Sequence, residues 1–475
     1  MRTVAVAVLT CLLSVPVAAQ GHDEERLNTR LVGTDDLQAR SAYQPLPVIQ
    51  DGRRILYVGH HAGEAHNPLT GAIEVNGTSI VDVTDPRRPV YLHHIPASGG
   101  AQGAQMVQVC SGADLPGAVA DETYLLRANG NQSHEVWEVS DPSNPTFVTT
   151  VARMGRTPDG EQHTHKTWWE CDTGLAYLVG TVDGWRAPRV LQAFDLSNPA
   201  APRRVRDFSL DGVQPDTAGP VPGGSGVHEV VRVGNRLYLS YGTSRDGVLQ
   251  IVDRERFLGG DPRAAAPLAA SPADLRFPQV GRLDLPGFWG AHTAYPLLGL
   301  EIADYARNRD QRIRDVLVLV SESVANQCQE PRHVVSFVDI TDEAHPWPVS
   351  TFQVAEAQGG FCERGGRFGP HGTQWYRGPP FYNRLQVFSW FNAGMRVVDV
   401  RNPFEPVEVG YYIPATTPNT DERCLTIDGV ERCKTAIQTN NVEVDDRGLV
   451  YLVDRANTGL HIVELTGSAA AILGG

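Results

Sequence analysis

Four histidines of this sequence stand at the start of short stretches rich in β-branched and aromatic residues. They are His165 (THKTWWEC), His228 (VHEVVRV), His292 (AHTAYPL) and His371 (PHGTQWY). Neutral imidazole is a good ligand for Zn, Cu, Fe and Ni, whereas Ca and Mg prefer oxygen donors. If the fold brings these side chains together, the sequence predicts a transition-metal site, with Fe, Cu or Zn bound by four protein nitrogens.

Acid and base groups lie close to these histidines in the sequence. A metal held by protein nitrogens on one side can keep positions open for water or substrate, as catalysis requires. Metal-bound histidines usually donate their second N–H to a carboxylate or a carbonyl, and Glu229 and Glu161 are the nearest carboxylates. His163 precedes His165 by two residues and is a candidate base or extra ligand. We therefore expect catalytic roles for His163, Glu161 and Glu229.

A repeated phrase reveals the elements that must position these residues. A short apolar strand ends in an acidic residue and a turn signal. The seven copies are SIVDVTDPRRP (79–89), EVWEVSDPSNP (135–145), LQAFDLSNPAAP (191–202), LQIVDRERF (249–257), SFVDITDEAHP (336–346), MRVVDVRNPFEP (395–406) and LHIVELTG (460–467). Another apolar strand precedes most copies and a further one follows, so four strands recur every roughly 60 to 80 residues.

This period is typical of propeller blades, so the sequence predicts an all-β, seven-bladed β-propeller of four-stranded antiparallel blades. The last copy lacks a fourth strand because the chain ends shortly after it. Residues 30–39 (RLVGTDDLQA) resemble such a strand and precede the first inner strand near residues 44–49. We expect this N-terminal strand to close the ring and residues 20–475 to form one propeller domain.

The phrase (L/V)-x-(I/V)-V-D-(V/I)-(S/T)-D-P-x-x-P resembles the LVIVD repeat of bacterial and archaeal propeller proteins, and it covers nearly all of the mature chain. The resemblance implies the fold and favours a bacterial periplasm, but it does not imply an activity, since function depends on the site and not on the fold. The fourth and seventh copies depart from the phrase and leave the blade boundaries there open.

Aligning the blades places the four histidines at equivalent positions. The start of each innermost strand carries, in chain order, Gln44, Gln105, His165, His228, His292, His371 and Asn441. Innermost strands line the central channel, so equivalent side chains face one another around it. The alternative is a polar channel packed around ordered water. The acidic residue that recurs in every copy is instead expected to satisfy turn or inter-blade hydrogen bonds.

The loops between the second and third strands of the blades open on the same face as the histidines. The first of them, residues 60–77, is long and contains His60, His61, Glu64 and His66. Its counterparts carry His134, Asp183, Trp185, Asp246, Glu322, Asn326, Asn392 and Arg455. Titratable and aromatic groups thus gather at one mouth of the channel, where we expect a binding site.

The N-terminus and the cysteines point to export. Residues 1–19 have the charged, apolar and small-residue regions of a cleavable signal peptide, and no later stretch is long and apolar enough for a membrane anchor. Six cysteines remain, for which the blade assignment favours the pairs Cys110–Cys171, Cys328–Cys362 and Cys424–Cys433 among 15 connectivities. We expect a periplasmic or secreted protein.

Charge and motifs exclude several classes of function. The net charge is −14 and no cluster of Lys or Arg is present, which argues against nucleic acid as a partner. P-loop, G-x-S-x-G, C-x-x-C and H-E-x-x-H motifs do not occur. The main hypothesis is a metal-dependent enzyme acting on a small molecule, either an oxidoreductase, which is favoured, or a hydrolase. The alternative is a non-catalytic propeller that binds a ligand or a protein in the cell envelope.

The four-histidine ring itself is similar to the iron site of carotenoid-cleaving oxygenases, which are also seven-bladed propellers. This likeness concerns the constellation of ligands and not the sequence family. It is the reason for favouring an oxidoreductase. A hydrolase is the alternative, because a metal can also lower the pKa of a bound water and so activate it.

Overall fold

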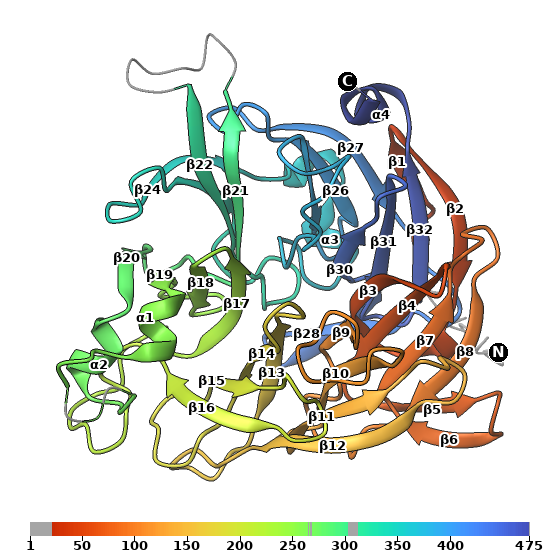
Figure 1. Ribbon diagram of the computed structural model, residues 1–475. Coiled ribbons are helices and arrows are strands. Elements are labelled where there is room, and N and C mark those ends of the chain that lie inside the picture. Colours follow the sequence, from red (N-terminus) through yellow and green to blue (C-terminus); the bar gives the residue numbers. More distant parts are fainter. Residues whose placement is uncertain (1–20, 265, 267, 303–311, 475) are drawn as a thin grey trace, which may run out of the picture.

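Seven four-stranded antiparallel sheets surround a central channel in the computed structural model of the protein (Figure 1). The structure describes residues 21–474 except 265, 267 and 303–311. The expected signal peptide, residues 1–19, lies outside the described residues. The all-β, seven-bladed propeller predicted from the repeat is confirmed.

Five blades follow the chain in simple order, from the innermost strand outwards. They are β3 (Ala42–Gln50), β4 (Arg53–His60), β7 (Thr78–Asp82) and β8 (Val90–Ile95); β9 (Val107–Ser111), β10 (Thr123–Asn129), β11 (Ser133–Glu138) and β12 (Thr146–Arg153); β13 (Thr164–Trp169), β14 (Leu175–Gly180), β15 (Val190–Asp195) and β16 (Arg203–Phe208); β17 (Val227–Val233), β18 (Arg236–Tyr241), β19 (Val248–Asp253) and β20 (Gln279–Asp284); and β21 (Thr293–Glu301), β22 (Ile313–Val320), β23 (Val335–Asp339) and β24 (Trp347–Phe352).

The last two blades each take a strand from the N-terminus. Blade seven contains β30 (Thr439–Val444), β31 (Leu449–Asp454), β32 (Leu460–Leu465) and then β2 (Thr29–Asp35), which confirms the closing strand. Blade six contains β25 (Leu385–Ser389), β26 (Met395–Asp399), β27 (Val407–Ile413) and then β1 (Glu25–Leu27). The pairing of β1 with β27 was not expected from the sequence.

The apolar residues of the strands are buried between neighbouring blades. Leu56 and Val58 of blade one, for example, share an apolar cluster with Tyr451, Val453 and Ile462 of blade seven. Both faces of an inner sheet are covered in this arrangement, which is why the second strands are almost continuous apolar runs and do not alternate with polar residues. The blades hold the inner strands in place around the channel.

Blade six departs from the repeat at its innermost segment, which begins at His371. This segment makes one isolated bridge to β25, between Thr373 and Phe388. The side chain of Gln374 replaces the missing backbone pairing, since its Oε1 accepts from the Val387 N–H at 2.7 Å and its Nε2 donates to the Leu385 carbonyl at 3.2 Å. The blade therefore keeps its inner segment without a regular strand.

The recurring acidic residues make turn hydrogen bonds, as the sequence predicts. Asp82, Asp195 and Asp339 each accept from the backbone N–H two residues later, at 2.8 to 2.9 Å. In the fourth copy Asp253 instead caps the N-terminus of α1 (Arg254–Gly259) and accepts from the Arg256 N–H. A short helix thus occupies the place of the turn where the sequence departs from the phrase.

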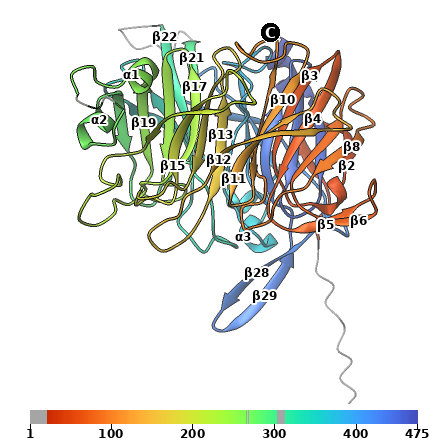
Figure 2. The same cartoon turned by 60° about the horizontal axis from the view of Figure 1, so that its bottom comes forward.

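Short insertions gather on the face from which the innermost strands begin, here called the loop face (Figure 2). They are the hairpin of β5 (Glu64–Asn67) and β6 (Ala72–Val75), α3 (Phe361–Arg364), and the projecting hairpin of β28 (Glu422–Ile427) and β29 (Val430–Thr435). The remaining helices of the described residues are α2 (Pro272–Arg276), α4 (Gly467–Gly474) and single 3₁₀ turns at Leu37–Ala39 and Glu356–Gln358. No described helix has both the length and the apolar character needed to span a membrane.

Three disulfides join the cysteine pairs that the blade assignment favours, which confirms that prediction. Cys110–Cys171 links β9 to the end of β13 and so ties blade two to blade three. Cys328–Cys362 joins the loop after β22 to α3, and Cys424–Cys433 crosses the projecting hairpin. These bonds are compatible with an oxidising compartment outside the cytoplasm.

Candidate metal centre

The structure brings the four histidines together at the loop-face end of the channel. Ring centroids are 4.4 Å apart for His165 and His228, 3.8 Å for His228 and His292, and 4.3 Å for His292 and His371. All four side chains are buried. Each one sits at the start of the innermost segment of its blade, so the repeat places the four imidazoles at one level of the channel.

The rings of His165 and His228 each donate a hydrogen bond from Nδ1 to an amide or carbonyl oxygen. The Nδ1 of His165 donates to the side-chain oxygen of Gln105 at 2.9 Å, and the Nδ1 of His228 donates to the backbone carbonyl of His292 at 2.7 Å. An oxygen acceptor at Nδ1 keeps the proton on that nitrogen. The Nε2 of each ring therefore carries a free lone pair.

The other two rings are held in the same way. The Nδ1 of His371 donates to the Asn440 carbonyl at 2.7 Å. The Nδ1 of His292 lies 2.8 Å from the hydroxyl oxygen of Thr293, and this hydroxyl donates its own proton to the Glu229 carboxylate. Glu229 therefore orients His292 through Thr293, as the carboxylates behind metal-bound histidines commonly do.

The Nε2 atoms of His165 and His228 consequently face each other as acceptors. His165 Nε2 lies 2.6 Å from His228 Nε2, although neither nitrogen has a proton to share in the tautomer that Nδ1 imposes. His292 Nε2 is buried without a hydrogen-bond partner among the described residues. Two lone pairs at such a distance repel each other unless a cation lies between or beside them.

Burial keeps the four imidazoles neutral. It lowers the pKa of His165, His228 and His292 well below the ordinary value, and neighbouring positive groups lower them further. Burial also lowers the pKa of His371, to about 4. Since metals bind the neutral form of imidazole, the rings are in the ligating state at neutral pH without any loss of protons.

A carboxylate completes the set of donors. Glu322, which follows β22, places Oε1 3.8 Å from His371 Nε2 and 2.9 Å from Nη1 of Arg367. One donor atom each from His292, Glu322 and His371 lies within 4.8 Å of the others. The sequence indicated Glu322 only as one of many polar loop residues, because its position relative to the ring depends on how the loop after β22 turns back.

A cavity of about 360 Å³ leads from the loop face to the histidines. His165, His228 and His371 form its inner wall with Glu322. Its remaining walls are mostly polar and include Tyr43, Gln102, Gln105, Thr243 and three arginines, which are Arg189, Arg367 and Arg455. The site is thus connected to a space in which a small ligand fits.

Aromatic side chains pack next to the histidines, and the Tyr43 ring centre is 5.6 Å from that of His371. Tyr43, Met106 and Trp375 form a buried cluster, against which Trp168 packs. The ammonium of Lys166 lies 4.8 Å from the Tyr43 ring centre and 3.8 Å from Oε1 of Glu229. Tyr43 and Lys166 could not be recognised as site residues from the sequence. A tyrosine within a strand looks like a packing residue and a lysine like a surface residue until the facing strands are known.

His163 and Glu161 lie beside this cavity and not in its walls. The Nε2 of His163 is 3.0 Å from the Glu161 carboxylate, so Glu161 contacts His163 and none of the four channel histidines. Both residues line a neighbouring cavity of about 480 Å³, which shares Arg189 and Thr243 with the first one. Of the three candidate catalytic residues, only Glu229 is linked to the four channel histidines, through the Thr293 hydroxyl that contacts His292.

The loop histidines are mostly separate from the centre. His61 alone borders the cavity, where its Nδ1 lies 3.0 Å from Nε2 of Gln105 and its Nε2 lies 3.2 Å from Oδ1 of Asn440. His60 is buried within blade one, 2.8 Å from the Ser79 hydroxyl. His66 is exposed on β5. Proximity along the sequence therefore overstated the number of histidines at the channel mouth.

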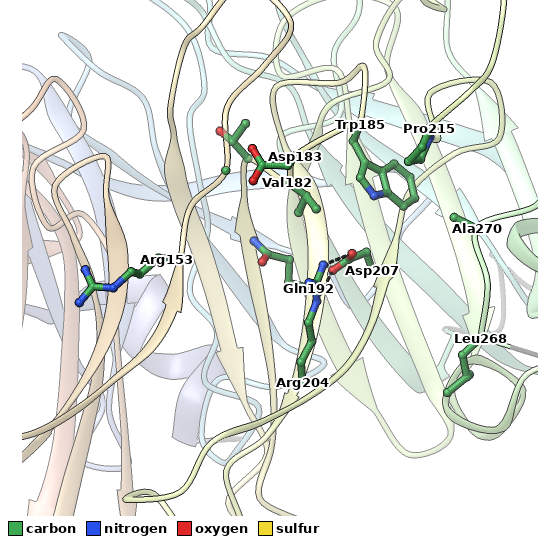
Figure 3. A pocket seen from close by; sticks show the side chains of 12 residues that line it. Arg153, Val182, Asp183, Trp185, Gln192, Arg204, Asp207, Pro215, Leu268 and Ala270 are labelled. Atoms are coloured by element: carbon green, nitrogen blue, oxygen red, sulfur yellow. Dashed lines mark hydrogen bonds and ion pairs between the residues drawn. The ribbon is translucent and has the colours of Figure 1, made fainter.

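Another pocket, at the outer side of blade three, lacks comparable chemistry (Figure 3). Trp185 forms part of its wall, and Arg204 and Asp207 pair with each other across it. Asp183 is engaged by the backbone N–H of Arg156 at 2.8 Å. No histidine or cysteine lines this pocket, so the channel cavity is the better candidate site.

Comparisons with known proteins add little beyond these observations. No protein-family profile matches the chain, and no curated protein matches it. Among solved structures, the chain is similar to the β-propeller domain of Cps50 (Swd1) from Myceliophteria thermophila, with 9% sequence identity and a TM-score of 0.46. That match covers 88% of this chain and 99% of the other.

Proposed function

We propose that the protein is a metal-dependent enzyme in which His165, His228, His292 and His371 bind Fe, Cu or Zn. The observation that carries this proposal is the set of hydrogen-bond partners around the four imidazole rings. All four Nδ1 atoms have oxygen partners, and the Nε2 atoms of His165 and His228 lie 2.6 Å apart. One donor atom each of His292 and His371 lies within 4.8 Å of the other and of Glu322. A channel packed merely for stability has no need to bring two such acceptors into contact and to leave a third, His292 Nε2, without a partner.

The chain's own groups would orient the centre and its substrate. Gln105, Thr293 with Glu229, and the carbonyls of His292 and Asn440 fix the imidazole rings. Glu322 is the carboxylate nearest the open side and can accept a proton from a bound molecule. The metal would supply Lewis acidity or one-electron chemistry. The likeness to other four-histidine sites favours an oxidoreductase, and a hydrolase is the alternative hypothesis.

We further infer that the chain is exported and related to the LVIVD-repeat proteins. The repeated phrase supports the relation, and residues 1–19 together with the three disulfides support a periplasmic or secreted location. A small molecule would be the substrate. No membrane anchor and no nucleic acid is part of this proposal.

Elemental analysis of the purified mature protein tests the metal centre. We expect about one Fe, Cu or Zn ion per chain, and its loss in a folded His228→Ala/His371→Ala variant. The matched control is His93→Ala/His345→Ala, which alters two histidines away from the channel and should retain the metal. Circular dichroism verifies the fold of each variant.

A wild-type protein that takes up none of the three metals on reconstitution would contradict the proposal. The protein would then be better explained as a non-catalytic propeller of the cell envelope, and activity screens would give way to a search for its ligand. Metal uptake that is equal in the double variant and the wild type would place the metal elsewhere on the chain and would likewise reject the assigned ligands.

A further inference from the structure

The cavity above the histidines is positively charged, although the protein is acidic. Its walls contain the three arginines Arg189, Arg367 and Arg455, and Glu322 is the only carboxylate among them. The whole chain has a formal net charge of −14. A concentration of positive charge in one concave site of an acidic protein focuses the local potential and attracts anions.

Only one of the three guanidinium groups is paired with a carboxylate. Arg367 donates to Glu322 at 2.9 Å and to the Ser323 carbonyl at 3.3 Å. Among the described residues, Arg189 and Arg455 make no side-chain hydrogen bond or ion pair, although both are half-buried and line the cavity. Two guanidinium groups are thus available to a molecule that enters the cavity.

The environment of these groups favours a bound anion. Burial, and then the charge of Arg367, lower the pKa of Arg455 to about 9, and burial also lowers the pKa of Arg189. A cation that has lost part of its hydration without gaining a partner is unfavourable. An oxyanion between the two groups would supply the missing partner, since guanidinium binds carboxylate and phosphate through paired hydrogen bonds.

We propose that the cavity binds a small organic anion whose carboxylate or phosphate group is held by Arg189 and Arg455, with the rest of the molecule directed towards the four histidines. Arg367 stays with Glu322 and keeps that carboxylate at the edge of the histidine ring. That the anion is a substrate rests on the proposed metal-dependent function, whereas the anion site itself does not depend on the metal.

The size and lining of the cavity restrict the class of ligand. A volume of about 360 Å³ is near the lower end of ordinary small-molecule sites. The walls present mainly Tyr, Gln, Thr, Arg and His side chains, with Ala101 and Val324 as apolar members. A long hydrocarbon would leave these polar groups without partners, so this site is suited to a compact polar anion and not to a lipid-like substrate.

Calorimetric titration of the metal-free protein tests the anion site without relying on activity, and a second portion of each preparation is reconstituted with metal for the metal analysis. The probes are inorganic phosphate, succinate and the uncharged succinamide. We expect saturable binding of phosphate or succinate, none of succinamide, and at least about a tenfold loss of affinity in Arg189→Gln/Arg455→Gln. The control Arg88→Gln/Arg203→Gln removes the same charge from exposed sites and should bind like the wild type.

The outcomes separate the two proposals. Binding of succinate alone identifies a carboxylate site, and binding of phosphate alone identifies a site for phosphate groups. Absence of saturable binding of both probes, or equal affinity in the wild type and the Arg189/Arg455 variant, would overturn the anion site. Metal content is measured on the portions reconstituted with Fe, Cu or Zn, so a protein that binds the anion but takes up no metal retains this site and loses only the proposed enzyme function.

Discussion

At the scale of single residues, the proposed metal centre depends on side chains that would not themselves bind the metal. Thr293 is the clearest case, because its hydroxyl accepts from Nδ1 of His292 and donates to Glu229 at the same time. Removing that hydroxyl leaves the ring free to adopt the other tautomer, in which Nε2 is protonated. Valine has nearly the same shape as threonine, so a Thr293→Val variant removes the hydroxyl without changing the packing.

We therefore expect Thr293→Val to weaken metal binding by about 10- to 100-fold while the protein remains folded. Thr293→Ser restores the hydroxyl and should restore most of the affinity, which a purely steric role of the side chain would not explain. Competition with a chelator of known affinity measures the effect. Equal metal affinity in the valine variant and the wild type would show that the Thr293 hydroxyl does not position His292.

Individual residues differ in how well their place in the site could be predicted from the sequence. The four histidines were visible because they share one position of a repeat, and strand starts at that position must lie around the channel. Tyr43 and Lys166 belong to inner strands but carry no repeated pattern, and Arg189 lies in a loop just before β15. Their roles depend on side-chain direction and on loop paths, which a single sequence does not encode in its periodicity.

At the scale of elements, the innermost segment of blade six shows how side chains replace a strand. Glu443 of β30 accepts backbone N–H groups of Trp375, Tyr376 and Val444, at 2.9 to 3.1 Å. The four strands of a blade were predicted from apolar runs and turn signals. Side-chain carboxylate and amide groups that take the place of strand pairing leave no apolar run or turn signal in the sequence. The irregular innermost segment of blade six was therefore not predicted.

Glu443 also makes a pH-dependent contribution to stability. Burial raises its pKa to about 7, so the folded protein holds the proton more tightly than the unfolded chain. The stabilisation is therefore complete below the ordinary pKa of glutamate and is lost as the pH rises through about 7.

Urea unfolding between pH 5 and 8 tests this contribution. We expect the free energy of unfolding of the wild type to fall with pH by up to about 1.4 kcal/mol per unit more steeply than that of Glu443→Gln. Glu431→Gln, on the exposed hairpin, is the control and should follow the wild type. Parallel curves for the wild type and Glu443→Gln would show that Glu443 does not titrate in this range.

At the scale of the whole molecule, the repeat was sufficient to predict the architecture. Blade number and the closing strand follow once the seven phrases are superposed, because each blade must bury both faces against its neighbours. For the disulfides, the blade assignment only favoured the observed pairs among 15 connectivities. What the repeat does not contain is the additional pairing of β1 with blade six, since β1 is only three residues long. Such a short strand is stabilised by its neighbours and not by its own sequence pattern.

The disulfides should contribute unequally to the stability of the ring. Cys110–Cys171 spans 61 residues and joins two blades, whereas Cys424–Cys433 spans 9 residues within one hairpin. From loop entropy alone, we expect losses of about 4 and 3 kcal/mol for the respective double serine variants, measured by urea unfolding. A larger loss for the hairpin pair would show that the inter-blade bond constrains the unfolded chain less than its span implies.

The strands β1 and β2 complete two neighbouring sheets across the junction between the chain ends, and Asn28 between them donates to the Val409 carbonyl at 2.7 Å. Residues near the beginning of the chain thus find their partners only after residues near its end have been made. During synthesis, a chain that does not yet include β30 to β32 cannot close the ring of blades. The channel, and the candidate metal centre within it, can therefore assemble only once β30 to β32 are present and β32 can pair with β2.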